Sequence, residues 1–225
     1  MRMTKPRLLL ASTALLLASC LAAPSFAQDR EGQSAASAPG NFDYYLFTLS
    51  WSPEFCASNP SGRTSAECGL NKHLGLVVHG LWPQFNNGTW PQDCAPTRPV
   101  AASTVNHMVS IMPNRSLIQH EWAKHGTCSG LMADDYFAAI DKLYNGLKIP
   151  GDFRNPSRSF TASPSDIEQK FGTANQATPE AFRISCPENK FAALEICVSK
   201  EWKYQACPDT VKECHATQAE VLPVP

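Results

Sequence analysis

The chain has 225 residues, and its 19 basic and 20 acidic side chains give a formal net charge of −1. This length is enough for one domain with a sizeable core, because single domains commonly reach about 200 residues. The near-neutral balance excludes a protein that coats nucleic acid stably, since that task requires a broad basic surface that exchanges counterions with phosphates.

The first segment of the chain has the composition of a secretory signal. Arg2, Lys5 and Arg7 precede the apolar run 8–17, and the small residues Ser25 and Ala27 follow. The apolar run is much shorter than the roughly 20 residues that a bilayer helix requires. We therefore predict a signal peptide over residues 1–27 and a soluble mature protein. Loss of this segment, which contains no acidic residue, lowers the formal charge from −1 to −4.

Cys20 offers an alternative to ordinary signal cleavage. The sequence Leu-Ala-Ser-Cys at 17–20 resembles a lipobox, so cleavage before Cys20 with lipid attachment competes with cleavage after Ala27. With ordinary cleavage, Cys20 is removed and eight of the nine cysteines remain. In an exported chain this even number predicts four disulfides, formed in an oxidising compartment such as the periplasm or the extracellular space.

The mature chain divides by composition into a leader, one domain and a tail. Residues 28–41 contain too little apolar surface to pack, and we expect a flexible leader there. The domain is predicted to span residues 42–217. Residues 218–225 are expected to form a loose C-terminal tail.

Hydrophobic periodicity predicts both strands and helices. Strands are expected at 42–51, where Tyr45, Phe47 and Leu49 share one parity, and also at 74–78, 191–198 and 202–204. Helices are expected at 100–112, 116–124 and 133–147, and two short helices are expected to begin at Ser163 and Thr178. Because these elements interleave without regular alternation, we predict an α+β domain with a mainly antiparallel sheet flanked by helices.

The densest polar cluster is His-Glu-Trp-Ala-Lys-His at 120–125, within a predicted helix. At about 100° per residue, Lys124, Glu121 and His125 lie roughly 40°, 100° and 140° from His120, on one side of the helix. A zinc-protease site requires histidines at i and i+4, and here they are five apart. The remaining structural alternative is a solvated helix face with an i,i+4 pair between Glu121 and His125.

The second polar site is His-Gly-Leu-Trp-Pro-Gln at 79–84, where His79 ends a predicted strand. A lone histidine there is typical of a satisfied structural residue, and Trp82 alone is typical of a core residue. The combination of this block with the cluster at 120–125 favours a functional site.

The two blocks together resemble the ribonuclease T2 family of secreted acid endoribonucleases, which has fungal, plant and bacterial periplasmic members. The block at 79–84 resembles the family's His-Gly-Leu-Trp-Pro, and 120–128 resembles His-Glu-Trp-x-Lys-His-Gly-Thr-Cys. The resemblance spans about residues 42–214. Many members have Gln in place of Ser50 and an acidic residue in place of Gln84, so the base preference is left open.

The resemblance implies cleavage of single-stranded RNA by transphosphorylation to a 2',3'-cyclic phosphate, followed by hydrolysis to a 3'-phosphate. His125 is the expected base and His79 the expected acid of the first step, and these roles reverse in the second. Lys124 and His120 are expected to stabilise the phosphate charge. Glu121 is expected to orient His125 or to keep a neighbouring imidazole protonated. No metal or other cofactor is implied, and the protein is expected to be a monomer that binds RNA transiently.

Trp82 is the expected platform for stacking a base, an interaction that tolerates different bases and therefore predicts low specificity. Tyr45, Trp51, Phe85 and Trp90 are expected in the core or in a cleft wall. Two other classes of protein remain as rivals, a binding module with inactive chemistry and a metal-dependent phosphoesterase. Finally, the resemblance implies the disulfide pairs Cys56–Cys68, Cys94–Cys128, Cys186–Cys214 and Cys197–Cys207.

Overall fold

A computed structural model describes residues 38–59, 66–68 and 72–225. The predicted signal peptide, the lipobox at Cys20 and most of the predicted leader lie outside these residues. The strands are β1 (Tyr44–Trp51), β2 (Leu76–Gln84), β3 (Phe160–Ala162), β4 (Phe182–Ser185), β5 (Ala193–Val198) and β6 (Ala219–Val221). The α-helices are α1 (Ser52–Ser58), α2 (Ala102–Met108), α3 (Arg115–Lys124), α4 (Ala133–Gly146), α5 (Gly151–Arg154) and α6 (Pro164–Asn175).

The main sheet has the strand order β2-β1-β5-β4, and all its neighbouring strands are antiparallel. Tyr45, Phe47 and Leu49 alternate along β1 and enter the main hydrophobic core. Helix α4 packs on this face, and the hydroxyl of its Tyr136 donates a hydrogen bond of 2.7 Å to the Leu81 carbonyl. The α+β class with a mainly antiparallel sheet flanked by helices is therefore confirmed.

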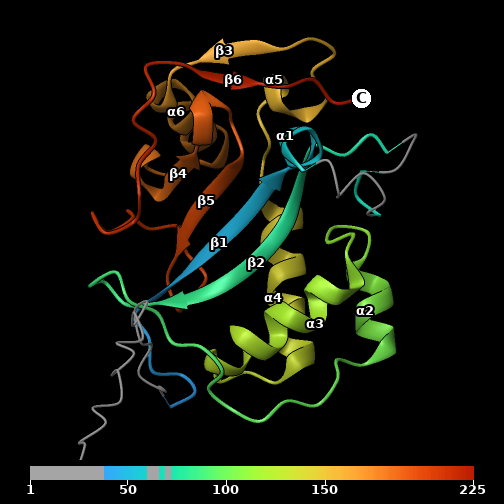
Figure 1. Ribbon diagram of the computed structural model, residues 1–225. Coiled ribbons are helices and arrows are strands. Elements are labelled where there is room, and N and C mark those ends of the chain that lie inside the picture. Colours follow the sequence, from blue (N-terminus) through green and yellow to red (C-terminus); the bar gives the residue numbers. More distant parts are fainter. Residues whose placement is uncertain (1–37, 60–65, 69–71) are drawn as a thin grey trace, which may run out of the picture. The chain divides into compact units, whose positions relative to one another are not determined.

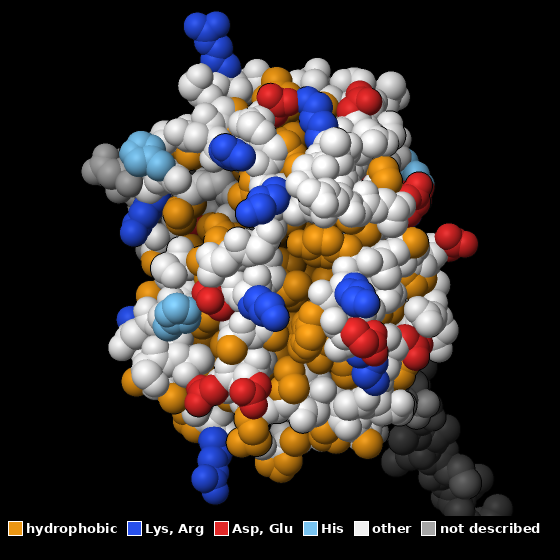
Figure 2. All heavy atoms as spheres, turned by 180° about the vertical axis from the view of Figure 1, so that it is seen from behind, with side chains coloured by type: hydrophobic (Ala, Val, Ile, Leu, Met, Phe, Trp, Pro, Cys, Tyr) orange, Lys and Arg blue, Asp and Glu red, His pale blue; other side chains and the backbone are white. Residues whose placement is uncertain are grey.

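The helices gather at opposite ends of the sheet order. Figure 1 shows α2, α3 and α4 grouped beside β2, whereas α6 lies beside β4 and the β3–β6 pair crosses the top of the view above α6. From behind, Figure 2 shows apolar side chains in a band down the middle of the surface, with lysine and arginine on both sides. No helix in the described part of the chain has the length and apolar character needed to cross a membrane.

The other face of β1 supports a second, smaller core. Tyr44 and Leu46 are buried there together with Cys197, Cys207 and Val211. This cluster fixes the segment that begins at Cys207 against the sheet. As a result, the face opposite α4 is covered only in part and keeps room for a cleft.

Four disulfides link the described residues, in the pairing that the family resemblance implied. Their Cα–Cα separations lie between 5.0 and 5.5 Å, within the usual range for this bond. The pairs are Cys56–Cys68, Cys94–Cys128, Cys186–Cys214 and Cys197–Cys207.

The prediction of a loose tail over residues 218–225 is wrong. Strand β6 pairs with β3 in antiparallel register, and Ala219 and Val221 are fully buried. The Trp51 indole N–H also donates to the Leu222 carbonyl at 3.1 Å. The segment is ordered because its alternate apolar side chains complete the main core. At the other end, the backbone N–H of Gly40 donates to the Cys128 carbonyl, so the end of the predicted leader contacts the domain.

Several boundaries differ from the sequence-based expectations. The helix expected at 100–112 is shortened to α2, and the helix expected after Thr178 is a single 3-10 turn, Pro179–Ala181. Residues 202–204 contribute only an isolated bridge, between Tyr204 and Val198. By contrast, the strand expected at 74–78 extends further than predicted. As β2 it continues through the histidine block to Gln84.

Candidate active site

A bulge in β2 builds the first part of the site. Thr48 of β1 lies opposite Gly80 and Leu49 lies opposite Val78, so His79 is the extra residue. Val78 enters the core, whereas His79 lines a cleft on the other face of the sheet. Gly80 follows on the cleft side, and its missing side chain leaves room for the Glu121 carboxylate.

Helix α3 supplies the opposite part of the site. Its N-cap residue Asn114 accepts hydrogen bonds from the backbone N–H groups of Ser116 and Leu117, which satisfies donors that the helix start leaves free. Fully buried Ile118 anchors the helix to the core. The helix ends with His125 as its C-cap, directly after Lys124.

Glu121 makes the central polar contacts of the site. Its Oε2 accepts a hydrogen bond of 2.6 Å from the Trp82 indole Nε1, and its Oε1 lies 3.9 Å from His79 Nε2. The residue is only 2% exposed. Burial raises the pKa of its carboxyl to about 7, although the Trp82 hydrogen bond and the Lys124 charge act in the opposite direction. The carboxyl can therefore hold a proton in mildly acidic solution.

Two neighbours hold the His79 imidazole. Its Nδ1 lies 3.4 Å from the Ser50 hydroxyl oxygen, on the side away from Glu121. Its ring meets the Trp82 ring edge-on, with 5.3 Å between the ring centroids. Desolvation, followed by the charge of His120, lowers the pKa of His79. The side chain is still 42% exposed, which leaves it accessible to a ligand in the cleft.

His125 also contacts Trp82, with 5.4 Å between the ring centroids. It is 7% exposed, and burial lowers the pKa of its imidazole to about 3, with further contributions from Lys124, His120 and His79. Its Nδ1 is buried and has no hydrogen-bond partner among the described residues. This imidazole is consequently neutral in both mildly acidic and neutral solution.

The six residues predicted for the site line one cleft of about 530 Å³. Among the described residues, Glu121 has its hydrogen bond with Trp82 and its ion pair with His79, and the i,i+4 pair with His125 that was the structural alternative for this helix face does not form. His120 is exposed at the rim. The residues brought together are His79, Trp82, His120, Glu121, Lys124 and His125.

The aromatic residues that were not chosen as contacts divide between core and cleft wall. Tyr45 and Trp51 are buried in the core, and Phe85 packs against it. Trp90 lines the cleft and is 42% exposed. It is therefore the most accessible aromatic surface among the described residues of the cleft.

A second wall of the cleft was not predicted from the sequence. Tyr44 and Glu195 contribute from β1 and β5, and Thr210, Val211 and Lys212 contribute from the segment before Cys214. The sequence did contain a signal for Tyr44. It precedes the core-facing Tyr45 in a strand, and neighbouring strand residues point to opposite faces. The residues near Lys212 gave no signal, because disulfides and contacts with residues distant in sequence bring that segment to the sheet.

The fold and this histidine-lined cleft define a disulfide-bonded α+β protein. Solved structures with a similar fold exist. An RNase-related protein from Calystegia sepium superposes with a TM-score of 0.63 at 22% sequence identity, covering 81% of this chain and 97% of that chain. At this identity the likeness establishes the fold.

Comparison of sequences establishes the family. The Ribonuclease T2 family model matches residues 42–214. A ribonuclease of Aeromonas hydrophila is 37% identical over 150 residues, covering 67% of this chain and 66% of that protein. A probable ribonuclease of Haemophilus influenzae is 33% identical over 191 residues, covering 80% and 65%. These matches span slightly less than two thirds of each relative. The chain belongs to the ribonuclease T2 family.

Proposed function

We propose that this protein is an endoribonuclease that cleaves single-stranded RNA with low base specificity. The observation that carries this proposal is the convergence of His79 and His125 on one cleft, beside the positive charge of Lys124. RNA supplies its own nucleophile, the 2'-hydroxyl. The protein must then remove one proton, donate another to the departing 5'-oxygen, and stabilise charge on the phosphate.

His125 is the base of the first step. A general base must be unprotonated when substrate binds, and burial keeps the His125 pKa at about 3. It accepts the proton of the 2'-hydroxyl, whose oxygen attacks phosphorus to form the 2',3'-cyclic phosphate. In the second step the protonated His125 imidazole returns this proton to the departing 2'-oxygen, while His79 accepts a proton from the water that attacks phosphorus, which opens the cyclic phosphate to a 3'-phosphate.

His79 is the acid of the first step, and Glu121 supports it. Burial alone disfavours the protonated form of His79, since it lowers the pKa of the imidazole. The Glu121 carboxyl, with a pKa of about 7 and an oxygen 3.9 Å from His79 Nε2, can share one proton with that imidazole in mild acid. A bound phosphate anion favours transfer of this proton to His79, which can then protonate the leaving 5'-oxygen.

The remaining cleft residues position the substrate. Lys124 and His120 place positive charge along the α3 side of the cleft, where it stabilises the extra charge on the phosphate oxygens. Trp82 fixes Glu121 through its N–H and presents the rest of its surface to the cleft for a base. Trp90 offers a further stacking surface nearer the solvent.

We further propose that the protein works without a metal or cofactor, as an exported monomer. The four disulfides support export, because such bonds persist in oxidising compartments. The predicted signal at residues 1–27 gives the route to the periplasm or the outside of the cell. Whether Cys20 carries a lipid is decided by the mass of the mature N-terminus.

The test is digestion of a short defined RNA by the wild type and by His79→Ala and His125→Ala, with mass analysis of the ends. Each variant should lose cleavage by about 100-fold or more, the usual contribution of a general acid or base. His107→Ala is the matched control, because His107 lies on α2 and pairs with Asp141 away from the cleft.

A cyclic phosphate intermediate followed by a 3'-phosphate identifies the proposed chemistry. Turnover should continue in excess chelator. Loss of turnover there would favour a metal-dependent phosphoesterase, and unreduced turnover in either cleft-histidine variant would refute the assigned roles.

A further inference from the structure

The segment 207–214 forms a fixed wall of the cleft opposite α3. Disulfides Cys197–Cys207 and Cys186–Cys214 attach both of its ends to the sheet region. In its middle, the Thr210 hydroxyl donates to the Asn86 carbonyl at 3.2 Å. The wall is therefore held to β5, to the segment after β4 and to the loop after β2.

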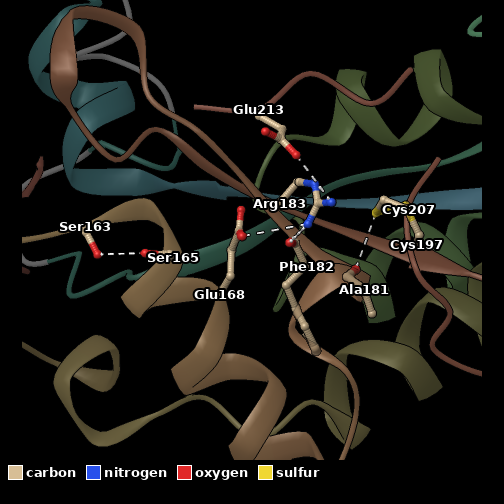
Figure 3. Close-up of polar contacts among 9 residues, drawn as sticks. All are labelled: Ser163, Ser165, Glu168, Ala181, Phe182, Arg183, Cys197, Cys207 and Glu213. Carbon is tan, nitrogen blue, oxygen red and sulfur yellow. Dashed lines mark hydrogen bonds and ion pairs between the residues drawn. A yellow bond between two sulfur atoms is a disulfide. The ribbon is translucent and has the colours of Figure 1, made fainter. Parts of the chain in front are cut away.

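A buried arginine strengthens this attachment. Figure 3 shows Arg183 of β4 directed between Glu168 of α6 and Glu213 of the wall. The nitrogen–oxygen distances are 3.7 Å to Glu168 and 3.5 Å to Glu213. Because Glu213 is held in this way, the neighbouring Lys212 has a fixed backbone from which to reach into the cleft.

Lys212 is an exposed lysine that lines the cleft. Its charge acts on the Glu195 carboxyl of β5 and lowers the pKa of that carboxyl against the larger upward effect of burial. Glu195 also lines the cleft, and it lies opposite the buried Thr48 in the pairing of β5 with β1. The pair thus places one positive and one negative group on the wall opposite Lys124.

An RNA strand in this cleft presents more than one phosphate. The scissile phosphate belongs beside Lys124 and the two imidazoles. A nucleotide further along the strand brings its phosphate toward the opposite wall, where Lys212 supplies the cation and Glu195 repels phosphate from β5. The anion is consequently directed to the ammonium group and kept away from the sheet.

We propose that Lys212 binds the phosphate that flanks the scissile one, so that the wall 207–214 forms a subsite for a neighbouring nucleotide. This inference rests on the proposed ribonuclease function. It predicts that the protein cleaves a substrate with a flanking phosphate faster than one without it. The Lys212–Glu195 pair then takes part in binding RNA, in addition to stabilising the fold.

The test compares one dinucleoside monophosphate in three forms: unmodified, 5'-phosphorylated and 3'-phosphorylated. The wild type should cleave one phosphorylated form with a kcat/KM about threefold to tenfold higher, as expected for an accessible charge-assisted contact. Lys212→Gln should lose this gain, so that its kcat/KM becomes the same for the phosphorylated and the unmodified forms. Lys212→Arg should retain the gain, and Lys142→Gln on α4 is the matched control outside the cleft.

The dependence of kcat/KM on salt provides a second readout with polymeric RNA. Loss of one phosphate contact should reduce the log–log slope by about 0.7 in Lys212→Gln, the value for a single-stranded polyanion. An unchanged slope, or equal losses on all three small substrates, would overturn the subsite. If the wild type cleaves none of the substrates, the proposed function itself fails, which is a separate result.

Discussion

At the scale of single residues, the site depends on a missing side chain. A Cβ atom at position 80 would overlap both the Glu121 carboxylate and the Trp82 indole nitrogen. These two groups form the 2.6 Å hydrogen bond that fixes Glu121 beside His79. The glycine in the first motif is therefore required by close approach.

Gly80→Ala is expected to break the Trp82–Glu121 contact and to reduce cleavage more than stability. Both groups must move to admit a methyl group, and a displacement of about 1 Å near the chemistry can reduce the rate by about 100-fold. Rate measurements and thermal unfolding on the same samples check this. Gly146→Ala is the control, because a Cβ there meets nothing within 4 Å. A fully active Gly80→Ala protein would contradict the argument.

The residues of the two motifs could be predicted from the sequence, but their partners could not. His79, Glu121 and His125 belong to short contiguous blocks whose composition indicates chemistry. The choice of Glu121 contacts depends on the bulge at His79, which places both His79 and Gly80 on the side of β2 that faces Glu121. Lys212 is further still from any motif, and its place in the cleft follows from disulfides and an ion pair made by distant residues.

At the scale of elements, β6 shows that a short terminal strand can belong to the core. Val221→Ala should lower the free energy of unfolding by about 2 kcal/mol, because it removes buried methyl groups and leaves a cavity. Urea unfolding measures the change. The control is Thr217→Ala, an exposed position just before the strand, and equal stability of the two variants would restore the view of a loose tail.

Long periodic elements were predictable, whereas short ones were not. Helix α4 repeats apolar residues on one face over several turns, and its observed bounds, Ala133–Gly146, agree closely with the expected 133–147. Strand β6 has three residues followed by a proline-rich end, which gives no periodic pattern. The hydroxyl and proline at 178–179 specify a helical start, but a strand follows at Phe182 and limits it to one 3-10 turn.

At the scale of the whole molecule, buried groups of opposite type make stability depend on pH in opposite directions. His125 has a folded pKa of about 3, below its usual 6.5, so its contribution to stability is lost as pH falls from 6.5 toward 3. Glu121 has a folded pKa of about 7, above its usual 4.5, so its contribution is present below 4.5 and lost as pH rises toward 7.

Two substitutions separate these effects. Between pH 7 and pH 4.5, His125→Asn should gain roughly 2 to 3 kcal/mol of stability relative to the wild type, because the unfolded histidine no longer takes up a proton. Glu121→Gln should shift in the opposite direction over the same range. Urea unfolding at the two pH values measures both, and shifts of the same sign would contradict the assignment.

The bulge at His79 also limits how this strand can be altered. On a regular strand, positions 79 and 82 differ by an odd number and point to opposite faces, so an imidazole and an indole could not both reach one ligand. The extra residue corrects this parity. A regular pairing of β1 with β2 that kept every residue but lost the bulge would turn one of the two rings into the hydrophobic interior, and no point substitution could compensate. At the present spacing of the motif, the bulge is therefore as indispensable as the residues themselves.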